Sequence, residues 1–306
     1  MSVAKEQREK LIWEFPNIGK KAPEQEEKAF AYCEGYKEFL NAAKTEREFV
    51  REAVLRLKEA GYEEFEEGKI YQPGDKVYQI NRKKALLMST FGKRPLEDGV
   101  RINVAHIDSP RLDLKPNPLY EKAEAAYFKT HYYGGIRKYQ WATIPLAMHG
   151  VVILKDGTSV DICIGEKEGD PVFCVTDLLP HLAAQQNERK LKDGIKGEEL
   201  NIIVGSLPYP CEEEDSIKEP VKLLALSILN ERFGMTEKDF LRAEIEFVPA
   251  VKATDVGLDR SLVGAYGQDD KVCAYTALTA EMKAKSPEYT TVTICLLYTS
   301  PSPRDA

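Results

Sequence analysis

The order in which hydrophobic periodicities change along the chain limits its possible folds more than any other feature. Residues 23–60 place apolar side chains at helical spacing, with Thr45 and Glu48 at the spacing of a capping box and Gly61 where a left-handed residue ends a helix. Three strand-like runs follow at 77–80, 85–90 and 100–105, bounded by glycine or polar clusters. This opening predicts two helices packed on the strands of a sheet.

The character of the chain changes after Pro116. Short β segments at 151–154 and 160–164 flank Asp156-Gly157, a signal for a hairpin with a primed turn. We expect helices at 178–188, 221–233 and 271–284, and strands at 243–248 and 291–297. We therefore interpret the chain as an α/β domain, residues 1–115 and 243–297, interrupted by an inserted β-rich domain, residues 116–242.

Composition excludes several classes of protein. The 306 residues are 43% hydrophobic and 30% charged, which is typical of a globular chain and not of a disordered one. The net charge of −7 disfavours nucleic acid and anionic lipid as partners, and no run of 18 apolar residues predicts a membrane span. The six cysteines show no C-x-x-C pair, which favours reduced, mostly buried thiols, and we expect a cytoplasmic protein.

The first motif with chemical potential is His106-Ile107-Asp108-Ser109-Pro110, which ends an apolar strand. In an extended segment His106 and Asp108 point the same way, because strand side chains alternate. The pair would suit a metal-binding imidazole that a carboxylate orients. A histidine that ends a strand beside an aspartate that begins a turn is the structural alternative, and the motif alone leaves both open.

The second motif is Gly267-Gln268-Asp269-Asp270, just before the helix expected at 271–284. Two carboxylates at a helix N-terminus can simply complement the positive end of the helix dipole. Alternatively, one carboxylate can bridge two metal ions about 3.5–4 Å apart. The spacing by itself does not decide between capping and metal binding.

Taken together, these motifs resemble a known family. The family is the aspartyl aminopeptidase/aminopeptidase I family of zinc metallopeptidases, in its bacterial branch. Segment 105–118 looks like its H-x-D-S-P segment, and segment 264–270 looks like its bridging-aspartate segment. Two further stretches resemble features of its inserted domain: the Gly-Gly segment at 133–136 and the segment 177–182. The similarity runs from about residue 30 to 297. It implies a mixed-sheet α/β/α peptidase domain with an inserted, barrel-like domain that assembles a homo-oligomer.

The resemblance also implies site roles. His106 would be a ligand of one zinc ion, Asp108 its orienting catalytic partner, and Asp269 the bridging ligand, with Asp270 next to it across an unusual peptide bond. His181 would reach the active site of a neighbouring subunit, although a histidine in Leu-Pro-His-Leu is equally well read as packed. His131 and His149 match no family role, and we expect both to be structural.

The chemistry implied is zinc-dependent removal of N-terminal residues from peptides, with two zinc ions activating a water molecule. In members that prefer acidic residues the segment after Gly-Gly reads Trp-Phe-Asp-Arg, whereas residues 141–146 here read Trp-Ala-Thr-Ile-Pro-Leu. This departure leaves the preferred N-terminal residue open.

A further departure concerns the catalytic glutamate. The family continues after the strand at 291–297 with a Glu-Glu segment that supplies the general base and a zinc ligand, whereas residues 298–306 read as a non-native tail. We expect a truncated, inactive fragment. Two other readings remain: a non-catalytic oligomerisation protein, and a related dizinc deacylase, against which the Lys115–Pro118 segment argues. No serine-hydrolase, phosphate-loop or dinucleotide motif occurs.

Overall fold

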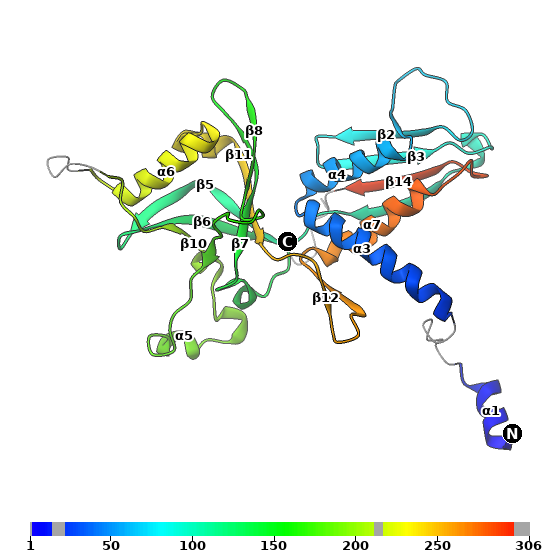
Figure 1. Cartoon of the computed structure of the whole chain (residues 1–306), viewed down its shortest axis with the longest axis horizontal. Coiled ribbons are helices and arrows are strands. Elements are labelled where there is room, and N and C mark those ends of the chain that lie inside the picture. The colour runs from blue at the N-terminus through cyan, green and yellow to red at the C-terminus, as the bar shows by residue number, and fades with distance from the viewer. Residues whose placement is uncertain (1, 14–21, 211–216, 297–306) are drawn as a thin grey trace.

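The computed structural model describes residues 2–13, 22–210 and 217–296, and Figure 1 shows two groups of elements, one around each of two sheets. The α-helices are α1 (Val3–Leu11), α3 (Glu26–Ala42), α4 (Glu46–Glu59), α5 (Ala184–Asn187), α6 (Pro220–Phe233) and α7 (Gln268–Met282). The strands are β1 (Glu63–Glu64), β2 (Lys76–Asn81), β3 (Ala85–Thr90), β4 (Arg101–His106), β5 (Arg111–Lys122), β6 (Ala125–Tyr133), β7 (Leu146–Ile153), β8 (Ser159–Ile164), β9 (Cys174–Val175), β10 (Ile202–Gly205), β11 (Ala243–Pro249), β12 (Thr254–Val256), β13 (Leu262–Gly264) and β14 (Thr291–Leu296). The predicted tail lies outside the described residues.

The first sheet has the order β1-β2-β3-β14-β4, and it is mixed because β14 runs antiparallel to β3 and parallel to β4. Helices α3, α4 and α7 pack with it around one hydrophobic core, whose fully buried members include Phe39, Phe49, Leu57 and Met88. The predicted capping box is present: Thr45 accepts from the Glu48 backbone, and the Glu48 side chain accepts from the Thr45 backbone. The α/β class with a mixed sheet is thus confirmed.

The second sheet has the order β8-β7-β11-β5-β6-β10-β9, with antiparallel neighbours throughout, and it curls into a half-barrel. Helix α6 contributes Val221, Ala225 and Leu229 to its core, together with Phe128 and Phe247 from the strands. This sheet corresponds to the β-rich part that the sequence predicts.

The strand expected at 243–248 is present but belongs to a different sheet from the one we predicted. As β11 it pairs with β7 and β5, so strands of the second sheet extend from Arg111 to Pro249. The helix expected at 178–188 is reduced to the single turn α5, Ala184–Asn187. The residue boundaries of the two domains stay a prediction.

The hairpin around Asp156-Gly157 is confirmed, but its turn differs from the expected one. Gly157 has a positive φ of 88°, while Asp156 is not among the residues with positive φ, so a primed turn with two left-handed residues does not form. The Gly157 amide donates to the Leu154 carbonyl, and the Leu154 amide donates to Thr158. This is a three-residue loop that ends in a left-handed glycine.

A buried polar network joins α4 to the second sheet. His149 of β7 lies between Glu48 and Glu166, with nitrogen–oxygen distances of 2.8 and 3.1 Å. Lys44, just before α4, pairs with Glu166 at 2.8 Å and donates to the Pro249 carbonyl. The two sheets are therefore held together by charged side chains as well as by the connecting chain.

Two sequence expectations concern the whole chain. The described cysteines, Cys33, Cys163, Cys174, Cys273 and Cys295, are free thiols, but the expectation that most are buried was wrong, because among them only Cys295 is buried. Within the described ranges, no helix has both the length and the apolar character that crossing a membrane would require.

Candidate metal centre

The candidate site lies where the chain passes from the first sheet to the second. His106 is the last residue of β4, and the link 107–110 leads directly into β5. The amide of Ile107 donates to the carbonyl of Leu296 at 3.0 Å, so pairing with β14 continues one residue beyond His106. Ile107 is fully buried on one side of this extended segment, which places His106 and Asp108 on the other.

The second contribution comes from the start of α7. Gly267, with φ of 80°, precedes the helix, and Asp269 departs from helical geometry with φ of −86° and ψ of 112°. The Asp269–Asp270 peptide bond is cis. The strand before this segment, β13, does not belong to the sheet of β4: it pairs with β12 in a separate two-stranded sheet.

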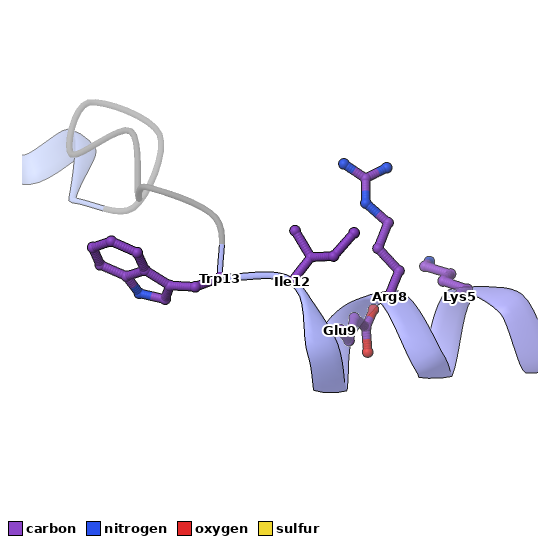
Figure 2. A pocket seen from close by; sticks show the side chains of 5 residues that line it. All are labelled: Lys5, Arg8, Glu9, Ile12 and Trp13. Carbon is purple, nitrogen blue, oxygen red and sulfur yellow. The ribbon is translucent and has the colours of Figure 1, made fainter.

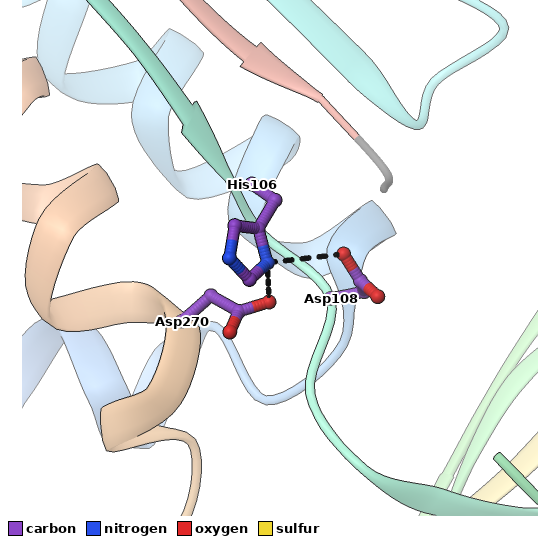
Figure 3. Close-up of side chains that lie close together, drawn as sticks. All are labelled: His106, Asp108 and Asp270. Atoms are coloured by element: carbon purple, nitrogen blue, oxygen red, sulfur yellow. Dashed lines mark ion pairs between the residues drawn. The ribbon is translucent and has the colours of Figure 1, made fainter. Parts of the chain in front are cut away.

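The side chains of His106, Asp108 and Asp270 converge (Figure 3). The Nδ1 atom of His106 lies 3.7 Å from Asp108 Oδ1 and in direct contact with Asp270 Oδ2. One ligand-type atom from each residue falls within 4.8 Å of the others. Zinc bonds to nitrogen and oxygen are about 2.0–2.2 Å long, so two ligand atoms of one ion lie at most about 4.4 Å apart. The cluster is therefore close to the size of a single ion's ligand shell.

Asp269 is not a member of this cluster, and its side chain is exposed. It nevertheless stays electrostatically close, because it acts on the carboxyl of Asp270 through a hydrogen bond and through its charge. The structure thus brings Asp270 into contact with His106, where sequence reasoning had favoured Asp269. The bridging role of Asp269 stays a prediction.

The electrostatics of the cluster fit a cation. Burial, followed by the neighbouring Asp269 and Asp108, raises the pKa of Asp270 to about 8. Burial accounts for the largest part of this rise and repulsion from the neighbouring carboxylates for the rest, and a divalent ion between the carboxylates would offset that repulsion. Imidazole nitrogen and carboxylate oxygen are also ligand types that zinc accepts. The residues present therefore fit a zinc site.

Sequence reasoning missed the residue that holds Asp108. Tyr133, at the end of β6, donates its hydroxyl to Asp108 Oδ2 at 2.6 Å. The guanidinium of Arg111 lies over the Tyr133 ring at 4.2 Å, and it is fixed in turn by Asp113 at 2.8 Å. The second sheet thus positions a carboxylate of the candidate site. The sequence signal that could have indicated this role was the Tyr133-Gly134-Gly135 segment, which entered only as part of the family resemblance.

The other histidines lie elsewhere. His149 is buried in the network that joins α4 to the second sheet, and the exposed His131 stacks on Tyr132 at 5.6 Å. His181 is exposed in a turn between β9 and α5, next to the exposed side chains of Leu179 and Leu182. Its predicted part in catalysis stays a prediction.

A hollow of about 470 Å³ lies along α1 and is lined by Lys5, Arg8, Glu9, Ile12 and Trp13 (Figure 2). None of these residues belongs to the cluster, and α1 has no buried residue. The hollow therefore adds nothing to the metal centre.

Comparison with known proteins gives a consistent result. A family model described as aminopeptidase I zinc metalloprotease (M18) matches residues 39–300. A probable M18 family aminopeptidase 1 of Clostridium acetobutylicum is 49% identical over 289 residues, which cover 93% of this chain and 62% of that protein.

Solved structures agree in fold. The crystal structure of an M18 family aminopeptidase from Thermotoga maritima matches with a TM-score of 0.86 and 46% identity, over 93% of this chain and 61% of that one. A more distant structure, the mApe1 dodecamer of S. cerevisiae, matches with a TM-score of 0.63 and 18% identity, over 86% of this chain and 59% of that one. The chain therefore spans about three-fifths of the length of these proteins.

Proposed function

Because the chain belongs to the aminopeptidase I zinc metalloprotease family, M18, we propose that it supplies part of a dizinc centre that removes N-terminal residues from peptides. The convergence of His106, Asp108 and Asp270 at the junction of the two sheets carries this proposal. In it, His106 and the Asp269–Asp270 pair hold metal, and Asp108 orients the imidazole.

The protein groups act by fixing charge and geometry. Asp108 is held by the Tyr133 hydroxyl and lies 3.7 Å from His106 Nδ1, the atom that Asp270 also contacts, and in this proposal its charge favours one orientation of the ring. When bound, zinc would supply a Lewis acid for the scissile carbonyl and lower the pKa of a water molecule toward neutrality. A bound cation would favour the ionised form of Asp270, whose pKa is otherwise raised, so that this carboxylate and Asp108 could offset the charge of the ion.

We place the complete activity in a longer protein. The chain spans 62% of its Clostridium relative, and the cluster among the described residues contains one histidine and no glutamate. Each catalytic zinc ordinarily keeps three protein ligands, so a centre with two zinc ions needs more ligands than this cluster offers, and hydrolysis also needs a general base. We therefore infer that the 306-residue chain is inactive by itself, and that the missing groups lie in the part of its relatives that it does not span.

We further propose a homo-oligomer assembled through the second sheet and its loops. The turn that carries His181 exposes Leu178, Leu179 and Leu182 by 55%, 66% and 70%, an apolar surface suited to a second subunit. In such an assembly His181 would approach a neighbouring active site. The free thiols of the described cysteines favour the cytoplasm as the location.

The test compares the 306-residue chain with a version extended to the length of its relatives. Both are purified and assayed on amino-acyl anilides and short peptides, with chelator and with added zinc. We expect zinc-dependent release of N-terminal residues from the long version alone, because general-base help by itself is worth about 10²–10⁴ in rate. An Asp270→Ala variant of the long version that retains full activity would contradict the site.

A further inference from the structure

A buried lysine lies immediately behind the metal cluster. Lys271 directly follows Asp270 and is 1% exposed, so its ammonium has been removed from water. Burying a charge is costly unless hydrogen bonds or a counter-charge replace its hydration. Within the part of the chain that the structure describes, no ion pair involves Lys271. Glu46, Glu246 and Asp270 act on Lys271 through their charge without forming an ion pair with it, so its direct contact must be sought elsewhere.

Its hydrogen bond goes to the other ligand-bearing segment. Lys271 Nζ donates to Ser109 Oγ at 2.8 Å, and Ser109 Oγ donates to the backbone carbonyl of Asp269 at 3.1 Å. Ser109 is the next residue after Asp108, whereas Lys271 and Asp269 flank Asp270. We call these two hydrogen bonds, from Lys271 to Ser109 and from Ser109 to the Asp269 carbonyl, the relay. The relay links the two segments that carry the candidate ligands, although about 160 residues separate them.

A second contact runs parallel to this relay. The hydroxyl of Tyr266 donates to the carbonyl of Pro110 at 3.0 Å, and the Tyr266 ring lies 5.5 Å from Lys271 Nζ. Residues 109–110 and 266–271 are therefore held together by three hydrogen bonds.

The packing around Gly267 shows how tightly the relay is enclosed. A Cβ atom at this position would lie 2.9 Å from Lys271 Nζ and 3.3 Å from Ser109 Oγ. Gly267 also has a positive φ of 80°, which other residues rarely adopt. Glycine is thus the residue that lets the backbone before α7 approach the ammonium and the hydroxyl this closely.

We propose that Lys271 is a positioning residue, which acts through Ser109 to set the spacing between the His106–Asp108 segment and the Asp269–Asp270 pair. This inference rests on the proposed metal centre. It predicts that metal affinity depends on two side chains that do not themselves face the cluster as ligands.

The experiment measures metal affinity and ligand geometry separately from folding. Wild type, Lys271→Met, Ser109→Ala, Ser109→Thr and the Lys271→Met/Ser109→Ala double variant are titrated with Zn²⁺ against a chromophoric chelator. The visible spectrum of bound Co²⁺ reports ligand geometry, and thermal melting reports the fold. Lys283→Met is the matched control, because Lys283 is exposed at the other end of the same helix.

We expect Ser109→Ala and Lys271→Met each to weaken zinc binding by about 10–100-fold and to change the Co²⁺ spectrum. Ser109→Thr, which keeps the hydroxyl, and Lys283→Met should stay within about threefold of wild type. The double variant should be no weaker than the worse single variant, because both changes break one relay.

Two outcomes overturn the idea in distinguishable ways. If wild type binds zinc and the folded single variants bind equally tightly, the positioning role fails while the metal centre stands. If wild type binds no zinc, the metal centre fails and the positioning role with it. Should Lys271→Met not fold, Ser109→Ala decides, since it removes a single oxygen atom.

Discussion

Replacing Tyr133 with phenylalanine isolates one hydrogen bond of the metal centre. The change removes the hydroxyl that donates to Asp108 Oδ2 at 2.6 Å and keeps the ring on which Arg111 lies at 4.2 Å. No cavity larger than one oxygen atom results. The substitution therefore tests whether Tyr133, a residue of the second sheet, supports zinc binding by holding Asp108 in place.

The expected loss of zinc affinity follows from the negative charge on the acceptor, the Asp108 carboxylate. A hydrogen bond to an ionised group contributes about 1.5–3 kcal/mol, which corresponds to roughly 10–150-fold in a binding constant. Loss of an outer-sphere partner of a metal-ligating histidine typically weakens metal binding by about 10–100-fold. We therefore expect Tyr133→Phe to weaken zinc affinity by about 10–100-fold, with a melting temperature close to that of wild type.

The assay is a calorimetric zinc titration of the purified chain at neutral pH. Tyr132→Phe is the matched control, because Tyr132 precedes Tyr133 on the same strand and its ring packs against Gly197 and His131. A Tyr133→Phe protein that binds zinc within threefold of wild type would refute the argument that this hydroxyl supports the site.

Two further predictions concern stability. Thr45→Ala removes the side-chain half of the α4 capping box and should lower the free energy of unfolding by about 1 kcal/mol, measured by urea denaturation, whereas Thr45→Ser should be nearly neutral. Burial lowers the pKa of His149, but hydrogen bonds to Glu166 and Glu48 outweigh burial and raise it to about 9. Because the folded pKa lies above the unfolded value of about 6.5, this contribution of up to about 3 kcal/mol is complete below pH 6.5 and is lost as pH rises toward 9. The stability difference between wild type and His149→Asn should shrink over that interval, and a difference that stays constant with pH would exclude the charged imidazole.

Local sequence patterns predicted much of the fold. The bounds expected for β3, 85–90, are those of the structure, and Thr45, Glu48 and Gly61 mark the ends of α4 as predicted. Such signals succeed because alternation and capping act over a few residues. The sheet to which β11 belongs depends instead on partners about 95 and 130 residues earlier in the chain, which no local window contains.

The residues of the candidate site also fall into those that local sequence predicts and those that only tertiary packing reveals. His106 and Asp108 could be paired from strand alternation, whereas the contact between His106 and Asp270 depends on how α7 packs against β4. Tyr133 and Lys271 carry no local signal of their roles. A lysine after two aspartates at a helix start is ordinarily solvated, and only the packing of Ser109 and Gly267 around it shows that it is buried.

The most direct measurement of the central claim is zinc retained by the purified chain in equilibrium dialysis, compared among wild type, His106→Ala, Asp270→Ala and His131→Ala. His131 is exposed and outside the cluster, so it controls for adventitious binding to histidine. We predict that wild type and His131→Ala retain zinc with equal affinity, while His106→Ala and Asp270→Ala bind at least about tenfold more weakly, since each loses a direct ligand. Equal retention by all four proteins would contradict a metal centre built on His106, Asp108 and Asp270.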